Sequence, residues 1–146
     1  MRKVLLSIVF VGGALLALQR GGLDGWLPAL SGPAGDADAV LADAFERRVG
    51  SLQVEGAGEV VRLLPDDRDG SRHQRFVLRL DSGQTVLVAH NIDLAPRVSG
   101  LREGDRVAFF GEYEWNERGG VIHWTHRDPQ GRHVAGWLKH AGRTYQ

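Results

Sequence analysis

The sequence predicts a mainly β fold: an OB-like five-stranded Greek-key barrel with a short N-terminal amphipathic helix, preceded by a signal or anchor helix. Three observations lead to this prediction. After residue 54, short segments with alternating apolar and polar residues are separated by turn residues. They come as three segments, a longer connection and two more segments, which is the strand order of an OB-fold. Gly58 and Gly111 interrupt the first and fourth segments, where a small barrel can bend sharply.

The N-terminal segment has the pattern of a targeting sequence. Arg2 and Lys3 precede an uncharged apolar run at 4–18. As a helix this run would span roughly 22 Å, short of the roughly 30 Å of a bilayer's hydrocarbon core. A signal peptide fits better than a transmembrane helix. We therefore expect a periplasmic or secreted protein, with retention in the inner membrane through residues 4–18 as the alternative.

The predicted organisation has three parts. Residues 1–18 are the signal peptide or N-terminal anchor, and 19–37 are a linker rich in Gly, Pro and Ala. Residues 38–146 form a single OB-like domain with a loop-rich C-terminal extension. The domain starts with an amphipathic helix that Asp36 or Asp38 can cap and Gly50 can end. The apolar face of this helix carries Val40, Leu41, Ala44 and Phe45.

Five strands follow the helix. Alternation and turn residues place them at 58–64, 74–80, 84–90, 106–115 and 121–126. Pro65 is expected to end the first strand. The tail beyond the fifth strand is expected to be mostly loop, with hairpin character in the segment GWLKHAGRTY and aromatic side chains that pack back onto the barrel. A simple meander and an SH3-like barrel are the structural alternatives.

The composition excludes several kinds of chemistry. The chain has no cysteine, so disulfides, zinc–thiolate sites and thiol nucleophiles are excluded. Eighteen basic residues balance eighteen acidic ones. A nucleic-acid interface would therefore have to be a local patch, because the chain has no overall attraction for polyanions.

The histidines are the main candidates for metal or proton chemistry. Neutral imidazole is a common metal ligand and also carries protons near neutral pH. His123 and His126 have opposite parity, so they can face one point only if the strand ends between them. We expect His126 and Asp128 to project together from that strand end. The predicted metal ligands are His90, His123, His126 and Asp128, and the predicted catalytic residues are His90, Asp93, His126 and Asp128.

A ligand site is predicted at one end of the barrel. The loops after the third and fifth strands, together with the loop between the first two strands, are expected to meet there. Trp124 is the best candidate for a surface aromatic that stacks on a ligand. The predicted ligand-binding residues are Arg72, His73, Asn91 and Trp124.

Four segments together resemble one family of small exported bacterial proteins, classed as domain of unknown function 3465. They are GSRHQRF, GQTVLVAHNIDLAPR, GEYEWNERGGVIHWTHRDP and GRHVAGWLKHAGRTYQ, and the resemblance covers about residues 50–146. It implies a single exported domain without an established activity. The motif positions it implies are His73, Gln74, His90, Asn91, Asp93, Trp115, Asn116, His123, Trp124, His126, Asp128 and Pro129.

Three functions remain open from the sequence. The first is a ligand-binding module for an oligonucleotide, a glycan or another anion. The alternative is a metal-assisted phosphodiester hydrolase, nuclease-like, in which a divalent metal is the cofactor. The third is a structural or interaction protein whose polar motif only stabilises loops.

Overall fold

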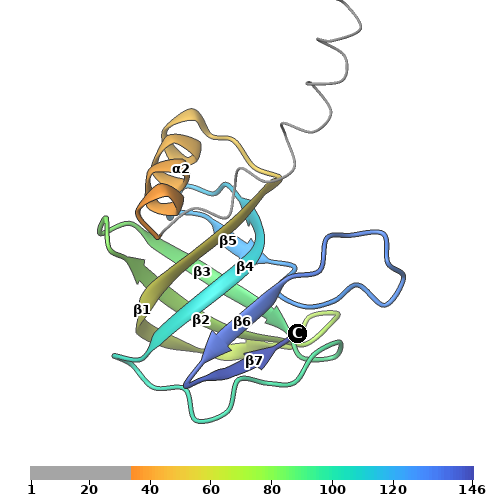
Figure 1. Ribbon diagram of the computed structural model, residues 1–146. Coiled ribbons are helices and arrows are strands. Elements are labelled where there is room, and N and C mark those ends of the chain that lie inside the picture. Colours follow the sequence, from red (N-terminus) through yellow and green to blue (C-terminus); the bar gives the residue numbers. More distant parts are fainter. Residues whose placement is uncertain (1–33) are drawn as a thin grey trace, which may run out of the picture. The chain divides into compact units, whose positions relative to one another are not determined.

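The computed structural model describes residues 34–146, which contain one α-helix and seven strands of one sheet (Figure 1). The predicted signal or anchor segment at 1–18 lies outside these residues, as does most of the predicted linker. Within 34–146 no helix is long and apolar enough to cross a membrane. The elements are α2 (Ala34–Arg47), β1 (Leu52–Asp67), β2 (His73–Leu80), β3 (Thr85–Asn91), β4 (Arg106–Glu114), β5 (Val121–His123), β6 (Trp137–His140) and β7 (Arg143–Tyr145).

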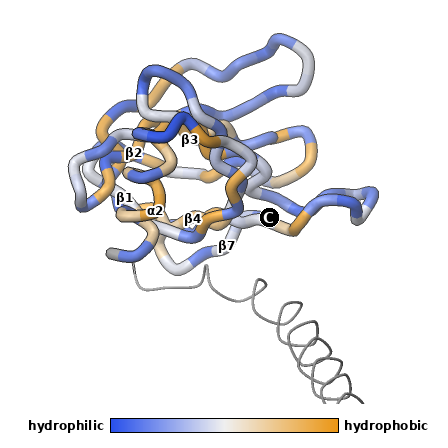
Figure 2. Tube along the Cα trace, turned by 90° about the horizontal axis from the view of Figure 1, so that it is seen from above, coloured by the Kyte–Doolittle hydropathy of each residue, from blue (hydrophilic) through white to orange (hydrophobic). Residues whose placement is uncertain are grey.

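Five strands pair in a closed ring. The order is β1-β2-β3-β5-β4, and β4 pairs again with β1. Every pairing in the ring is antiparallel except β3 with β5, which is parallel. The mainly β prediction is confirmed, and each predicted strand segment overlaps one strand of the ring. The loops that leave the ring are mainly hydrophilic (Figure 2).

The core lies inside the ring, because alternate strand residues point inward. Phe76 and Leu78 of β2 and Phe109 and Tyr113 of β4 are fully buried. This alternation is the pattern that the sequence showed. Helix α2 lies at one end of the ring (Figure 1). Its buried Leu41 belongs to the same core.

Helix α2 is fastened to the ring by polar contacts. The Asp38 carboxylate accepts a hydrogen bond from the backbone N–H of Ser82, in the β2–β3 turn, at 2.8 Å. The indole of Trp115 donates to the Phe45 carbonyl at 3.1 Å, and the two rings stack. The helix includes Ala34, which lies inside the segment predicted as linker.

Strand β1 is longer than predicted. It begins at Leu52 and continues beyond Pro65, which was expected to end it. Register shifts in the β1–β2 pairing lie between Val60 and Arg62 and between Leu64 and Asp67. Pro65 sits in the second irregularity, where a missing backbone N–H breaks no ladder hydrogen bond.

The C-terminal tail extends the sheet by a hairpin, β6–β7, which agrees with the hairpin character of its sequence. β4 pairs with β6 through Val107–Phe110 and with β5 through Glu112–Glu114. Gly111 lies at the change of partner. A Cβ at this position would lie 2.5 Å from the His123 carbonyl oxygen, so only glycine allows β4 and β5 to approach so closely.

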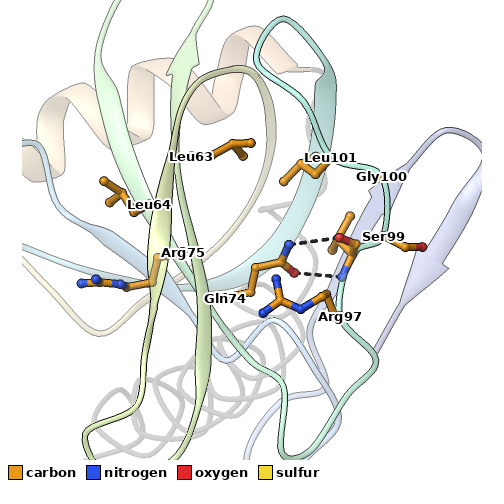
Figure 3. Close-up of a pocket in the computed structure, with 9 residues that line it drawn as sticks. Leu63, Leu64, Gln74, Arg75, Arg97, Ser99, Gly100 and Leu101 are labelled. Atoms are coloured by element: carbon orange, nitrogen blue, oxygen red, sulfur yellow. Dashed lines mark hydrogen bonds between the residues drawn. The ribbon is translucent and has the colours of Figure 1, made fainter.

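The buried side chain of Gln74 holds the middle of the connection between β3 and β4. The amide of Gln74 donates to the Val98 carbonyl at 3.0 Å, and its oxygen accepts from the Val98 N–H at 2.9 Å (Figure 3). The amide thus pairs with a peptide group as a neighbouring strand would. Beside it is a hollow of about 380 Å³, whose lining includes Leu63, Arg75 and Leu101.

Replacing Gln74 with leucine is expected to lower the free energy of unfolding by roughly 2 kcal/mol, because the peptide group of Val98 would stay buried without partners. Urea unfolding measures this loss. The exposed Gln130 is the control, and Gln130→Leu should change stability by less than about 0.5 kcal/mol. Equal effects of the two substitutions would show that the connection is held in another way.

Candidate functional site

Strand β5 ends at His123, because the next residue leaves the extended conformation. Trp124 has a φ of 52°, in the left-handed region that bulky residues seldom adopt. This turn removes the parity conflict between His123 and His126, since the strand does end between them. Backbone strain of this kind is concentrated at functional sites, where the surrounding structure maintains it.

A pocket lies where three loops meet, at the ends of β3 and β5 and the start of β2. Its volume is about 180 Å³. It contains three of the four predicted ligand-binding residues, His73, Asn91 and Trp124, together with two predicted metal ligands, His123 and His126. The lining is completed by Ser71, Ala89 and Leu94.

Several polar atoms around this pocket are not used by the protein itself. His73 uses Nδ1 to bond the Ser71 carbonyl at 2.8 Å, and His126 uses Nδ1 to bond the Arg127 carbonyl at 2.7 Å. Asn91 uses its Oδ1 to accept from the N–H of Asp93 at 2.9 Å. Within residues 34–146, both Nε2 atoms and the Asn91 Nδ2 have no hydrogen-bond partner. They remain available to a ligand.

His90 is a structural residue in this arrangement. It is fully buried, with Nδ1 2.8 Å from the Thr125 hydroxyl and Nε2 2.9 Å from the Pro96 carbonyl. Burial lowers the pKa of His90 to about 4, so the ring is neutral at pH 7. A neutral ring that donates from Nε2 and accepts at Nδ1 satisfies both contacts. It joins the loop after β3 to the segment that carries Trp124 and His126.

The two predicted acidic residues organise loops. Asp93 accepts hydrogen bonds from the backbone N–H of Arg72 at 2.9 Å and from its guanidinium at 2.7 Å. Asp128 accepts from the backbone N–H groups of Gln130, Arg132 and His133. These hydrogen bonds hold the pKa of both carboxyl groups below the ordinary value. Both carboxylates therefore already have their partners, and Arg72 is committed to Asp93.

The predicted metal ligands do not converge. Within residues 34–146, the only three residues whose donor atoms all lie within 4.8 Å of one another are Glu112, Glu114 and His123. His90 is committed at both ring nitrogens and Asp128 caps a loop, so the predicted set of His90, His123, His126 and Asp128 does not form such a group. Of this second group (Glu112, Glu114 and His123), only His123 was among the predicted metal ligands.

The second group continues into His133. The Nε2 of His133 lies 2.7 Å from a Glu112 oxygen, and that of His123 lies 3.5 Å from the other. Burial lowers the pKa of His123 and the two glutamates oppose this effect. Burial alone would raise the pKa of Glu112, but the hydrogen bond to His133 contributes to a net lowering.

Trp124 connects the pocket with the second group. Its ring stacks on His133 with centroids 4.1 Å apart and an interplanar angle of 8°, and it lies 5.4 Å from the ring of His126. One face of the indole is therefore covered by an imidazole. Trp124 therefore separates the pocket from the second group, and its covered face is not open for stacking on a nucleic-acid base.

A family model matches this chain over residues 26–146, and its description is "Protein of unknown function (DUF3465)". The chain belongs to this family. The match includes α2 and all seven strands, so it reaches further towards the N-terminus than the resemblance read from the motifs. No curated protein matches the chain. The family assignment leaves the activity to be argued from the site.

The grouping of Glu112, Glu114 and His133 with His123 was not predicted from the sequence. The signal was present, because Glu112 and Glu114 alternate on one face of β4 and a short turn leads into β5. The hairpin pairing places Glu112 opposite His123. The approach of His133 could not be found in this way, because the loop after β5 brings it back.

Proposed function

We propose that this domain is a ligand-binding module, an OB-type barrel that takes an anionic group of an oligonucleotide, a glycan or another oxyanion at the three-loop pocket. The observation that carries this proposal is the gathering of His73, Asn91 and His126 around one hollow of about 180 Å³, each with a polar atom free of protein partners. The strand order of the ring supports the OB-type assignment. OB-type barrels bind ligands through loops near strand ends, which is where this pocket lies.

The available atoms favour an anion. The Asn91 amide and the Ser71 hydroxyl are donors, and each imidazole Nε2 donates when the ring is protonated. Leu94 and Ala89 supply apolar surface beside them. A phosphate or sulfate on a sugar has both the acceptor oxygens and the apolar ring edges that this lining suits. Electrostatic binding of this kind weakens as the salt concentration rises.

Calorimetric titration tests the proposal with three ligands: a ten-nucleotide single-stranded DNA, a sulfated disaccharide and inorganic phosphate. At least one is expected to bind, and Asn91→Ala and His73→Ala are expected to weaken it by about tenfold each, the loss of one hydrogen bond to a charged group. His140→Ala is the control, because His140 bonds Asp105 away from the pocket. Unchanged affinity in both pocket variants would contradict the assignment.

A metal-assisted phosphodiester hydrolase is the second candidate. One observation favours it: His123 lines the pocket and also approaches Glu112 at 3.5 Å, so a carboxylate–imidazole group adjoins the ligand site. Turnover of a phosphodiester substrate that stops when EDTA is added would support this candidate. Binding that survives EDTA without turnover would leave the binding module.

We propose export on the basis of the charged start and the apolar run at 4–18. Cell fractionation tests it. Recovery in the periplasm or the medium with residues 1–18 removed supports a signal peptide, and recovery of the intact chain in the inner membrane supports the anchor. A cytoplasmic location would contradict both.

A further inference from the structure

The outer face of the sheet carries a compact group of metal-type ligands beside the pocket. Glu112 and Glu114 are two residues apart on β4, so both point away from the core. His123 on β5 stands directly across from Glu112. One donor atom from each of the three residues lies within 4.8 Å of the others. The positions are fixed by strand pairing, and no flexible loop is needed to assemble them.

Within residues 34–146, no lysine or arginine balances the charges of this group. Within the described part of the chain, Glu112 forms ion pairs only with His123 and His133, and Glu114 forms none. Glu114 instead accepts from the backbone N–H and the hydroxyl of Ser51, both at 3.1 Å. Two half-buried carboxylates therefore share a small volume without a lysine or arginine between them, an arrangement that a cation would stabilise.

Two buried nitrogens around the carboxylates make no hydrogen bond within residues 34–146, although one of them, the Nε2 of His123, approaches Glu112 at 3.5 Å. The Nε2 of His123 is inaccessible to solvent and makes no hydrogen bond within residues 34–146. The same holds for the Nε2 of Gln53, a residue that stands opposite Glu112 in the β1–β4 pairing. Buried polar atoms are normally satisfied, so an orphaned imidazole nitrogen next to two carboxylates points to a missing partner that accepts its lone pair.

We propose that Glu112, Glu114 and His123 bind a divalent transition-metal ion of the zinc class. An imidazole nitrogen with two carboxylate oxygens suits Zn²⁺ or Mn²⁺ better than Ca²⁺, which takes oxygen ligands. Tetrahedral zinc ligands at about 2.1 Å from the metal lie about 3.4 Å from one another. The donor atoms lie within 4.8 Å of one another without the ion, so they would move closer together around it.

 The His133 ring hydrogen-bonds one Glu112 oxygen at 2.7 Å, and Ser51 holds Glu114. Contacts of this kind orient the ligands in metal sites. His123 also borders the three-loop pocket, and three protein ligands leave a coordination position for water or a bound group.

Titration with the metal alone tests this site, whatever the pocket binds. The full chain, freed of metal with EDTA and dialysed, is titrated with ZnCl₂ and then with MnCl₂ in a calorimeter. One ion per chain is expected to bind. Glu112→Gln, Glu114→Gln and His123→Ala are each expected to weaken binding at least tenfold. Glu59→Gln is the matched control, because Glu59 lies on the same sheet and pairs with Arg79.

A second measurement separates this site from surface histidines that bind zinc weakly. Nitrogen-15 NMR of the imidazoles should show zinc shifting the Nε2 signal of His123 first, and circular dichroism should show that each variant keeps its fold. Zinc binding that is unchanged in Glu112→Gln and Glu114→Gln would overturn the proposal. So would binding lost in His126→Ala and kept in His123→Ala. Failure of the anion ligands to bind would affect only the pocket.

Discussion

Between pH 6.5 and pH 4 the free energy of unfolding is expected to fall by roughly 3 kcal/mol through His90 alone. Burial lowers the pKa of His90 from 6.5 to about 4 in the folded protein, whereas the unfolded chain takes up this proton near 6.5. In this window the unfolded state binds more protons, so acid favours unfolding. The contribution is fully present above pH 6.5 and is lost as the pH falls through the folded pKa.

The charges around His90 act in the same direction as its burial. His126, His73 and Arg97 each lower its pKa further, and only the hydrogen bond to Pro96 opposes them. His123 also has a lowered pKa, so it adds to the loss in acid. The exposed aspartates with lowered pKa values lose their contribution below the ordinary value of 3.8, beneath this window.

Urea unfolding of the wild type and of His90→Gln, at pH values from 7.5 to 4.5, isolates the contribution of His90. Glutamine has no titration in this range and keeps an amide donor for the Pro96 carbonyl. The stability difference between the two proteins should therefore shrink as the pH falls. His140→Gln serves as the control, since His140 faces the Asp105 carboxylate. Two parallel stability curves for wild type and His90→Gln would show that His90 is not the titrating group.

Alternation along the chain was enough to predict the ring, because one face of each strand packs on the core. The predicted strand ends were wrong where the local sequence pattern conflicts with the tertiary structure. Pro65 has the pattern of a strand end, yet β1 accommodates it in an irregularity opposite β2. The fifth strand was expected to reach His126 but stops at His123, where Trp124 turns into the left-handed region. Residue propensity does not predict that turn, because bulky residues seldom adopt the left-handed conformation.

The meeting of three loops at one end of the ring was predicted from the sequence, but the contacts of the individual side chains there were not. Chain order brings the loops after β1, β3 and β5 to one end, so His73, Asn91 and Trp124 could be expected together. The sequence could not distinguish an imidazole that lines a pocket from one that is buried between two loops. His90 was therefore taken for a ligand, although Thr125 and Pro96 occupy both its nitrogens.

Gly136→Ala is expected to lower the free energy of unfolding by about 3 kcal/mol, near the upper end of what overpacking costs. A Cβ at this position would overlap the Trp124 carbonyl oxygen and lie 2.5 Å from that of Phe110. Both are backbone atoms, so neither can swing aside as a flexible side chain would. The N–H of Gly136 also donates to the His126 carbonyl at 3.0 Å, which ties the start of β6 to the segment that carries the pocket residues.

The same substitution is expected to weaken ligand binding at the pocket, because any backbone shift at residue 136 moves the carbonyls of Trp124 and His126. Gly131→Ala is the matched control. Gly131 has a φ of 64° with nothing within 4 Å of an added Cβ, so it should cost only about 1 kcal/mol for the left-handed conformation. Thermal or urea unfolding of the two variants measures the difference. Equal losses would mean that the strand-end segment yields to the added methyl group, and that Gly136 does not hold Trp124 and His126 in place.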